Sequence, residues 1–220
     1  MEELRGADGT RRRILDAAAE LFEESGYGNV SLSDVVRRSG VSRGAFNHHF
    51  PNKESLAAAL MMYAEAELAQ KIRSEASESS SALENLIRAS FAQQNLILND
   101  AKVSVGIRLA QSINQFSGTP IAELAPNWTA LFQAGITEAV AAGDLYRHVD
   151  GRKLGYVLWC GIVANNMVAH TSGMNPIEGL ATIWGVHLRG AASATSLGYY
   201  QKLVQRIASQ YLSNGPDPSG

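Results

Sequence analysis

The chain contains a single cysteine, Cys160, among its 220 residues. One cysteine excludes an internal disulfide and fits a reducing compartment, so we expect a cytoplasmic protein. Long apolar runs are also missing, because the most apolar stretch, residues 156–168, is interrupted by Asn165 and Asn166 and is too short and polar to span a membrane. The start, MEELRGADGT, lacks the apolar centre of a signal peptide. We therefore expect no membrane association.

A basic excess is absent as well. The formal net charge is -2, and residues 1–55 contain eight Arg and Lys side chains against nine Asp and Glu. This balance excludes a protein that coats nucleic acid through bulk positive charge. A DNA-binding surface therefore requires that the basic side chains lie on one side of the helices and the acidic side chains on another.

Motifs of the common enzyme classes are missing too. We find no phosphate-binding loop, no His/Cys cluster with metal-ligand spacing and no nucleophile elbow. His48 and His49 are adjacent, and neighbouring positions of a helix point about 100° apart, so they cannot chelate one ion together. Cys160 lies in an apolar run, which would raise the pKa of its thiol and make it inert, so we interpret it as a core residue. We expect no catalytic residue, no metal and no cofactor.

What the sequence does contain is helical periodicity along most of its length, without an alternating run between hairpin turns. The expected fold class is all-α. Residues 1–9 are expected to be disordered, and an amphipathic helix is expected from Arg11 to Gly26. The later helices are expected at about 53–77, 83–96, 102–115, 124–142, 151–170, 176–189 and 196–212, with loops at 77–81 and 117–120 and a flexible tail from 215.

Residues 31–53 contain two short helical patterns separated by a glycine turn. Ser33 is placed to cap the first pattern and Ser42 the second. Gly40 accepts the positive φ that a sharp helix end needs, and Pro51 ends the second pattern. Two short helices joined in this way predict a helix-turn-helix, which reads DNA.

The stretch that begins at Arg12 and ends at Leu60 resembles the TetR family of transcriptional repressors. Its pieces RxxILDAAxxLFxxxGY and GVSxGAxxxHFxxKxxL carry the resemblance. The remainder is similar to the γ-butyrolactone autoregulator receptors of that family, through VGIRLAQ at 105–111, NWTALF around Trp128 and AAGDLYRHVD at 141–150. The resemblance implies a homodimer. It also implies an N-terminal three-helix helix-turn-helix DNA-binding domain at 1–54 and a C-terminal helical ligand-binding and dimerisation domain at 55–220.

By this resemblance, Arg43 reads bases, because its guanidinium matches the two acceptors of guanine. Ser31 and Lys53 would hold phosphates. Asn47 stands where the family usually has Tyr, and its amide suits either a phosphate or an adenine edge. Val36 stands where the family usually has Ala. The whole set of expected DNA-binding residues is Arg12, Ser31, Ser42, Arg43, Gly44, Ala45, Asn47, His48 and Lys53.

The ligand implied by the resemblance is a small, mostly apolar lactone, to which the indole N–H of Trp128 would donate. The expected ligand-binding residues are Trp128, Phe132, Phe91, Gln94, Val105, Trp159, Val163, Asn165 and Asn166. Receptors of this branch often carry Gln and Thr where this chain has Ala64 and Val163. Either Asn165 or Asn166 replaces them, or the ligand differs, or the chain is an orphan receptor. An unpaired buried amide is costly, so each Asn should bond the ligand, the backbone or the dimer mate.

The function expected from these observations is a dimeric repressor that leaves a palindromic double-stranded DNA operator when the lactone binds, as in quorum sensing and secondary metabolism. Residues 106–109 are expected to touch the DNA-binding domain and to transmit the change. The alternatives are an orphan regulator and, in another class, a helical interaction module or enzyme. The expected dimer face consists of Gly155, Gly161, Ala164 and Val168 together with Ile183, Trp184, Val186 and Leu188.

Overall fold

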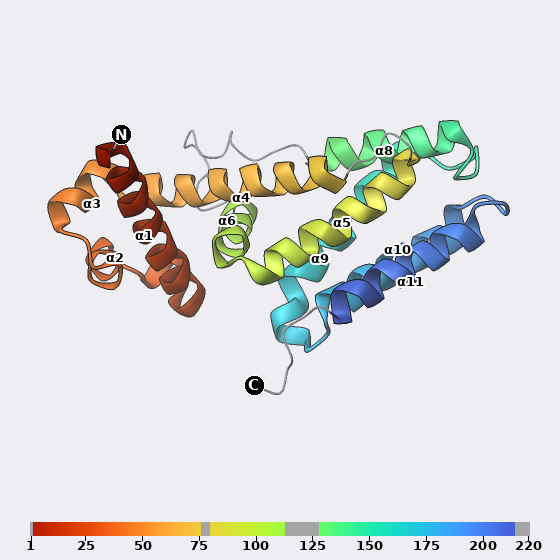
Figure 1. Cartoon of the computed structure of the whole chain (residues 1–220). Coiled ribbons are helices and arrows are strands. Elements are labelled where there is room, and N and C mark those ends of the chain that lie inside the picture. Colours follow the sequence, from red (N-terminus) through yellow and green to blue (C-terminus); the bar gives the residue numbers. More distant parts are fainter. Residues whose placement is uncertain (1, 76–79, 113–127, 214–220) are drawn as a thin grey trace. The chain divides into compact units, whose positions relative to one another are not determined.

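The computed structural model describes residues 2–75, 80–112 and 128–213 (Figure 1). This part of the chain is all-α, as predicted, and its β-pairing is limited to an isolated antiparallel bridge between Leu145 and Ala192. The elements are α1 (Glu2–Ser25), η1 (Tyr27–Asn29), α2 (Leu32–Ser39), α3 (Arg43–His49), α4 (Lys53–Glu75), α5 (Ala82–Asn99), α6 (Ala101–Gln111), α8 (Trp128–Ala142), α9 (Gly151–Ser172), α10 (Pro176–Ala191) and α11 (Leu197–Ser213).

The prediction of disorder over residues 1–9 is wrong, because α1 begins at Glu2. Gly6 and Gly9 lower the helix propensity of this start. Extending an existing helix adds one hydrogen bond per residue and avoids the cost of nucleation, however. The amphipathic segment can therefore be extended through residues of low helix propensity at its N-terminal end. The loop predicted at 117–120, most of the serine-rich break and the tail lie outside the described residues.

The contacts divide the chain into two compact units. The first comprises Met1–Gln70 and Leu96–Pro126, and the second comprises Lys71–Asn95 and Asn127–Gly220. The first unit contains the segment predicted to bind DNA, together with most of α4 and all of α6. Within the described ranges, no helix of either unit is apolar enough over a sufficient length to cross a membrane.

The core of the first unit is formed by α1 to α4 and by α6. Its buried side chains include Ile14, Phe22, Val35, Phe46, Phe50, Leu56, Leu60, Val105 and Leu109. The last two lie on α6, so the predicted contact between residues 106–109 and the DNA-binding segment is confirmed. Burying large apolar side chains contributes about 1.5–3 kcal/mol each, so α6 is part of what holds this unit together.

Polar contacts also tie α6 to its neighbours. Asp100 caps α6 by accepting from the backbone N–H groups of Lys102 and Val103, at 2.8 and 3.2 Å. The hydroxyl of Tyr63 on α4 donates to Asp100 at 2.9 Å, and the ammonium of Lys102 lies 2.5 Å from Asp16 on α1. The start of α6 is therefore held to both α1 and α4.

The core of the second unit lies among α5, α8, α9, α10 and α11. It includes Leu83, Ile87, Phe91, Phe132, Ile136, Leu158, Ile162, Leu180, Trp184, Leu203 and Ile207. Within it, the indole N–H of Trp184 on α10 donates to the hydroxyl of Ser90 on α5 at 2.9 Å. Gly155 lets α9 approach α8 closely, since a Cβ there would lie 2.6 Å from the Cα of Gln133.

Candidate nucleic-acid interface

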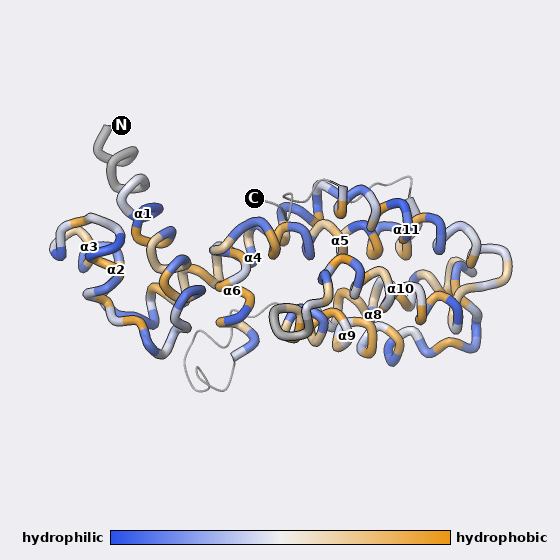
Figure 2. The backbone as a smooth tube through the Cα atoms, turned by 90° about the horizontal axis from the view of Figure 1, so that it is seen from below, coloured by the Kyte–Doolittle hydropathy of each residue, from blue (hydrophilic) through white to orange (hydrophobic). Residues whose placement is uncertain are grey.

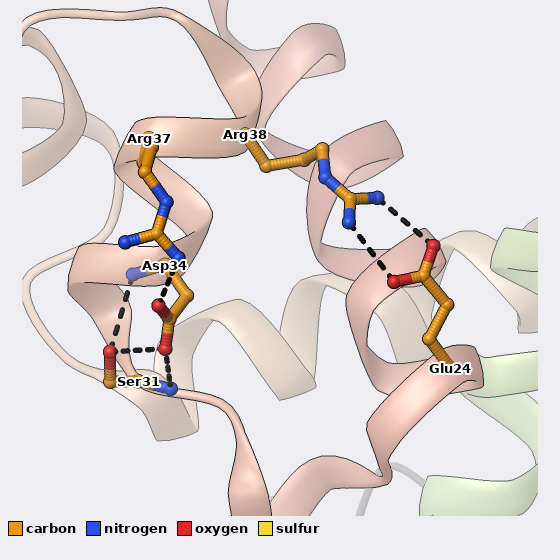
Figure 3. Close-up of polar contacts among 5 residues, drawn as sticks. All are labelled: Glu24, Ser31, Asp34, Arg37 and Arg38. Carbon is orange, nitrogen blue, oxygen red and sulfur yellow. Dashed lines mark hydrogen bonds and ion pairs between the residues drawn. The ribbon is translucent and has the colours of Figure 1, made fainter.

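The N-terminus of α2 is fixed by Ser31 and Asp34 (Figure 3). The Ser31 hydroxyl accepts from the backbone N–H of Asp34 at 3.2 Å, and the Asp34 carboxylate accepts from the Ser31 hydroxyl at 2.6 Å and its backbone N–H at 3.0 Å. This reciprocal pair is a capping box, with the cap three residues before its acidic partner. The prediction that Ser33 caps this helix is wrong, because α2 begins at Leu32 and Ser33 lies inside its first turn.

The turn between α2 and α3 is shaped by Gly40, whose φ of 63° is the left-handed conformation that was predicted for it. Arg13 on α1 secures this turn from the other side. Its guanidinium donates to the carbonyls of Ser39 and Gly40, at 2.8 and 3.1 Å. Arg13 therefore positions α2 and α3, a role that the run of three arginines did not reveal.

The two arginines of α2, Arg37 and Arg38, both form ion pairs with acidic side chains. Arg38 donates to both carboxylate oxygens of Glu24, at 3.1 and 3.0 Å (Figure 3). It also donates to Glu20 at 3.1 Å, and both bonds tie α2 to α1. The hydrogen bond from Arg38 lowers the pKa of Glu24. Arg37 pairs with Asp34 at 2.6 Å. Three of the acidic residues in the charge count, Glu20, Glu24 and Asp34, thus pair with the arginines of α2.

Helix α3 separates core residues from exposed ones. Ser42 caps it, as predicted, by accepting from the backbone N–H of Ala45 at 3.2 Å. Phe46 and Phe50 are 1% and 2% exposed and pack in the core, which confirms their predicted role. The opposite face carries Arg43, Gly44, Asn47 and His48, which are all exposed, beside the half-buried Ala45.

Arg43 differs from the other arginines near the turn. Within the described residues its side chain makes no ion pair and no hydrogen bond, so its guanidinium is available to an external partner. A free, exposed guanidinium on the first turn of a short capped helix is the arrangement that a base-reading arginine needs.

The flanks of α3 carry further cations. Lys53, at the start of α4, lies over the ring of Tyr27, with its nitrogen 4.3 Å from the ring centroid. Burial lowers the pKa of this lysine. Arg11 lies over the ring of Phe50 at 5.5 Å, and Arg12 is exposed. Sequence reasoning missed Arg11 and Tyr27, because contacts between cations and rings from separate segments leave no local pattern.

Residues 14–60 match the family of bacterial regulatory proteins named tetR. This stretch is a tetR-type N-terminal domain. The first unit therefore carries a tetR-type DNA-binding segment, and the chain is a transcriptional regulator rather than an enzyme.

Several known proteins resemble this regulator. Over 52 residues, 24% of this chain, it is 44% identical to the A-factor receptor protein of Streptomyces griseus, and the match spans 19% of that receptor. A crystal structure of a gamma-butyrolactone receptor, an ArpA-like protein, has a TM-score of 0.81 and 28% identity, covering 93% of this chain and 98% of that one. The TetR family protein CprB from Streptomyces coelicolor, solved in complex with its biological operator sequence, has a TM-score of 0.79 and 27% identity over the same shares. By these similarities the regulator is related to the gamma-butyrolactone receptors.

In the second unit, the structure brings three of the expected ligand-binding aromatics together. The rings of Trp128 and Trp159 stack with their centroids 6.3 Å apart, and the Phe132 ring lies 5.4 Å from that of Trp159. Phe132 is 1% exposed, whereas both tryptophans are half-buried. This cluster lies between α8 and α9.

Other expected ligand-binding residues lie elsewhere. Phe91 is fully buried and stacks on Tyr211 of α11, with centroids 6.5 Å apart. Gln94, one turn further along α5, is 2% exposed. Val105 packs in the core of the first unit, among residues of α1 and α4, and is not part of the second unit's clusters. Two surface cavities of the second unit, of about 320 and 490 Å³, are lined by residues outside the expected set.

Of the two asparagines on α9, Asn165 has a hydrogen-bond partner that distinguishes among the expected ones, which were the ligand, the backbone and the dimer mate. The Asn165 amide donates to the backbone carbonyl of Pro176 at 2.9 Å, which is the backbone option. It also lies over Gly179, where a Cβ would approach its oxygen to 2.0 Å. Asn165 therefore joins α9 to the start of α10. Asn166 and Val163 are half-buried.

Figure 2 shows apolar residues along α9 and α10, and several large apolar side chains of these helices are exposed. They are Tyr156, Val157, Met167, Val168 and Val186, and they form the exposed apolar face of α9 and α10. Cys160 lies on the same face and is exposed, so its prediction as a core residue is wrong. Because nearly all residues around Cys160 are apolar, hydropathy alone does not show which face of the helix is buried.

Only some residues of the expected dimer face are exposed in the single chain. Ala164, Val168 and Val186 are exposed. Trp184 and Leu188 are 1% and 2% exposed and belong to the core of their own chain, so they are not available to a partner.

Proposed function

We propose that the regulator is a dimeric repressor that binds a palindromic DNA operator and leaves it when a small, mostly apolar lactone binds. The observation that carries the DNA-binding part is the free guanidinium of Arg43 on the exposed face of α3. In this proposal DNA binding belongs to residues 1–54, and ligand binding and dimerisation belong to residues 55–220. The receptors named above support the ligand class, and quorum sensing and secondary metabolism are the processes it would serve.

The proposed operator contacts divide into two kinds. Arg43, Ala45 and Asn47 would meet base edges, because they lie on the first turns of the recognition helix. Phosphates would be held by Arg12, Ser31, Ser42, Gly44, His48 and Lys53. The Ser31 hydroxyl donates its proton to Asp34, so a phosphate contact would require the hydroxyl to rotate away from that carboxylate.

A dimer is proposed because two recognition helices must reach successive major grooves, about 34–36 Å apart. The exposed apolar face of α9 and α10 supports a two-fold contact, since patches of this kind on soluble proteins commonly mark interfaces. Val186 and Met167 are 52% and 64% exposed in the single chain. Association would remove both from water.

The ligand is proposed to meet the aromatic cluster of Trp128, Phe132 and Trp159. Its binding would favour a conformer in which the two recognition helices no longer match the operator. To move the equilibrium nearly completely, the ligand must prefer that conformer by about 5.5 kcal/mol. Helix α6 is the proposed transmitter, because Val105 and Leu109 belong to the core that also holds α1 and α3.

An operator mobility-shift assay with titration of a 2-alkyl-γ-butyrolactone tests this function. Wild-type protein should shift a palindromic operator, and saturating lactone should release it. Calorimetry on the same samples reports whether the lactone is bound. Full operator binding by protein that is saturated with lactone would contradict the release mechanism.

The second candidate is an orphan regulator that answers to another small molecule or to none. What supports it is the loss of polar side chains at Ala64 and Val163, together with the use of Asn165 to bond Pro176. A thermal-shift panel of butyrolactones, butenolides and antibiotics separates the two candidates. Stabilisation by butyrolactones alone supports the first, and stabilisation by another class or by no compound supports the second.

A further inference from the structure

Helix α3, which carries the proposed base readers, is short. It has seven residues, Arg43–His49, and helices of fewer than about 12 residues are marginal on their own. Its inward anchors are Phe46, which is 1% exposed, and Phe50, the residue at which the helix ends. Packing on one face determines which side of α3 is buried, whereas the tilt of the helix depends on contacts at its two ends. What holds those ends therefore sets how α3 meets DNA.

Arg13 on α1 holds the end at which α3 begins. Its guanidinium donates to the carbonyls of Ser39 and Gly40, at 2.8 and 3.1 Å. Both carbonyls lie at the C-terminal end of α2, where the helix dipole favours a cation, and Gly40 is two residues before the α3 cap, Ser42. The contact is close, since a Cβ at Gly40 would lie 3.2 Å from a nitrogen of the same guanidinium. The turn that leads into α3 is therefore tied to α1.

Arg11 on α1 lies at the other end of α3. Its guanidinium carbon is 5.5 Å from the centroid of the Phe50 ring, which is within the range of a cation–π contact. Phe50 is the C-cap of α3, and its backbone N–H donates to the carbonyl of Phe46 at 2.8 Å. Residues two positions apart on a helix point in different directions, so Arg11 and Arg13 leave α1 on different sides. One turn of α1 thus reaches both ends of α3.

Arg12, between these two arginines, has no such contact. It is exposed, and within the described residues its side chain makes no hydrogen bond and no ion pair. Arg12 can therefore meet a phosphate without giving up a contact inside the protein, whereas Arg11 and Arg13 cannot. The three consecutive arginines are equal in charge but differ in what their guanidinium groups are free to do.

We propose that Arg11 and Arg13 are positioning residues that set the operator specificity of α3 without contacting DNA. By holding the helix at both ends, they fix the angle at which Arg43 and its neighbours meet the base edges. This inference rests on the DNA-binding part of the proposed function. Phosphate contacts carry no sequence information directly, so a positioning role and a phosphate role have different consequences for binding.

Three single variants, Arg11→Gln, Arg12→Gln and Arg13→Gln, test this division. All three positions are exposed, and glutamine has nearly the helix propensity of arginine, so each variant should fold. Fluorescence anisotropy at several salt concentrations measures the affinity for two DNA duplexes. One is the palindrome that wild-type protein enriches from a pool of random sequences, and the other is a scrambled duplex of the same composition.

The two roles predict different results. Arg13→Gln should lower the preference for the palindrome over the scrambled duplex about 10-fold, because two charge-assisted hydrogen bonds are lost. Arg11→Gln should lower it about 2- to 5-fold, because a cation–π contact is lost. Both variants should keep the wild-type salt dependence. Arg12→Gln should instead weaken binding to both duplexes alike and reduce the slope of log affinity against log salt by about 0.9.

Two outcomes of this measurement would overturn the inference. One is a wild-type preference in Arg11→Gln and Arg13→Gln together with a slope reduced by about 0.9, which would make them phosphate contacts. The other is a wild-type preference together with a lower melting temperature, which would make their role merely structural.

Hydrogen exchange of the DNA-free protein gives an independent measure. The backbone N–H groups of Phe46 and Phe50 bond to the carbonyls of Ser42 and Phe46, at 2.9 and 2.8 Å. Both should exchange faster than in wild type when Arg11 or Arg13 is replaced, and at the wild-type rate in Arg12→Gln. Wild-type rates in all three variants would overturn the inference. If wild-type protein enriches no palindrome, the proposed function falls, and the exchange rates alone decide whether these arginines hold α3.

Discussion

The roles of single arginines in the first unit depend on their partners. Arg13 is held by two backbone carbonyls and Arg38 by two glutamates, and both therefore join α1 to α2. Arg43 has neither kind of partner in the described structure. The sequence counts all three as equal positive charges, although only the last is available to DNA.

Replacing Arg43 with Ala should weaken binding to the specific operator by about 1–3 kcal/mol, which is about 5- to 150-fold, because a bidentate contact to guanine is lost. Fluorescence anisotropy at one fixed salt concentration measures this change. Arg73→Ala is the matched control, since Arg73 is an exposed arginine on the part of α4 in the second unit. Equal affinities for wild type and Arg43→Ala would remove Arg43 from the base-reading set.

Replacing Ser31 with Ala should lower the free energy of unfolding by about 0.5–2 kcal/mol, because the α2 cap is lost. Ser33→Ala is the control, and a change within about 0.5 kcal/mol is expected there, as for other exposed positions. Urea unfolding of both variants at pH 7 tests the assignment of the cap. A larger loss in Ser33→Ala than in Ser31→Ala would contradict it.

The same cap carries a pH dependence. The Ser31 hydroxyl, followed by its backbone N–H and by Arg37, lowers the pKa of Asp34 below its usual value of 3.8. Because the pKa of Asp34 is lowered in the folded state, the ionised carboxylate stabilises the folded protein. This stabilisation is complete above pH about 4 and is lost as the pH falls through the lowered pKa. In Ser31→Ala the Asp34 pKa should rise toward its usual value, which NMR titration of the carboxyl carbon measures. An unchanged pKa would show that Arg37 and the backbone bond suffice.

Among the helices of the first unit, α6 crosses α4 at close range. At Gly106 a Cβ would lie 2.4 Å from the carbonyl oxygen of Leu60 and 2.7 Å from the Cβ of Ala64. Backbone atoms cannot give way as a flexible side chain can. The absent side chain therefore sets how closely α6 approaches α4.

Replacing Gly106 with Ala should lower the free energy of unfolding by about 1–3 kcal/mol, because the helices must move apart. Gly44→Ala is an informative comparison, since a Cβ there meets nothing within 4 Å. At that helical position alanine should raise stability by about 0.5–1 kcal/mol. Chemical denaturation compares the two, and equal effects would mean that the α6–α4 crossing is not tight in solution.

For the whole molecule, the apolar face on α9 and α10 determines the expected assembly. Replacing Val186 with Glu should convert the dimer to monomer, because a charge would be placed in an apolar contact. Sedimentation velocity measures the assembly, and operator affinity should fall with it. Gln205→Glu adds the same charge at an exposed position of α11 and should leave the dimer intact. A dimeric Val186→Glu would place the contact on another face.

The sequence alone determined the all-α class, the helix-turn-helix with its Gly40 turn and Ser42 cap, and the core roles of Phe46 and Phe50. These features depend on neighbours within a few residues, which spacing and residue type reveal. Only the tertiary structure decided which arginine is free, that Val105 belongs to the first core, that Cys160 faces outward and that Asn165 bonds Pro176. The reason is physical: each of these depends on which segments, distant in sequence, come within hydrogen-bonding or packing distance.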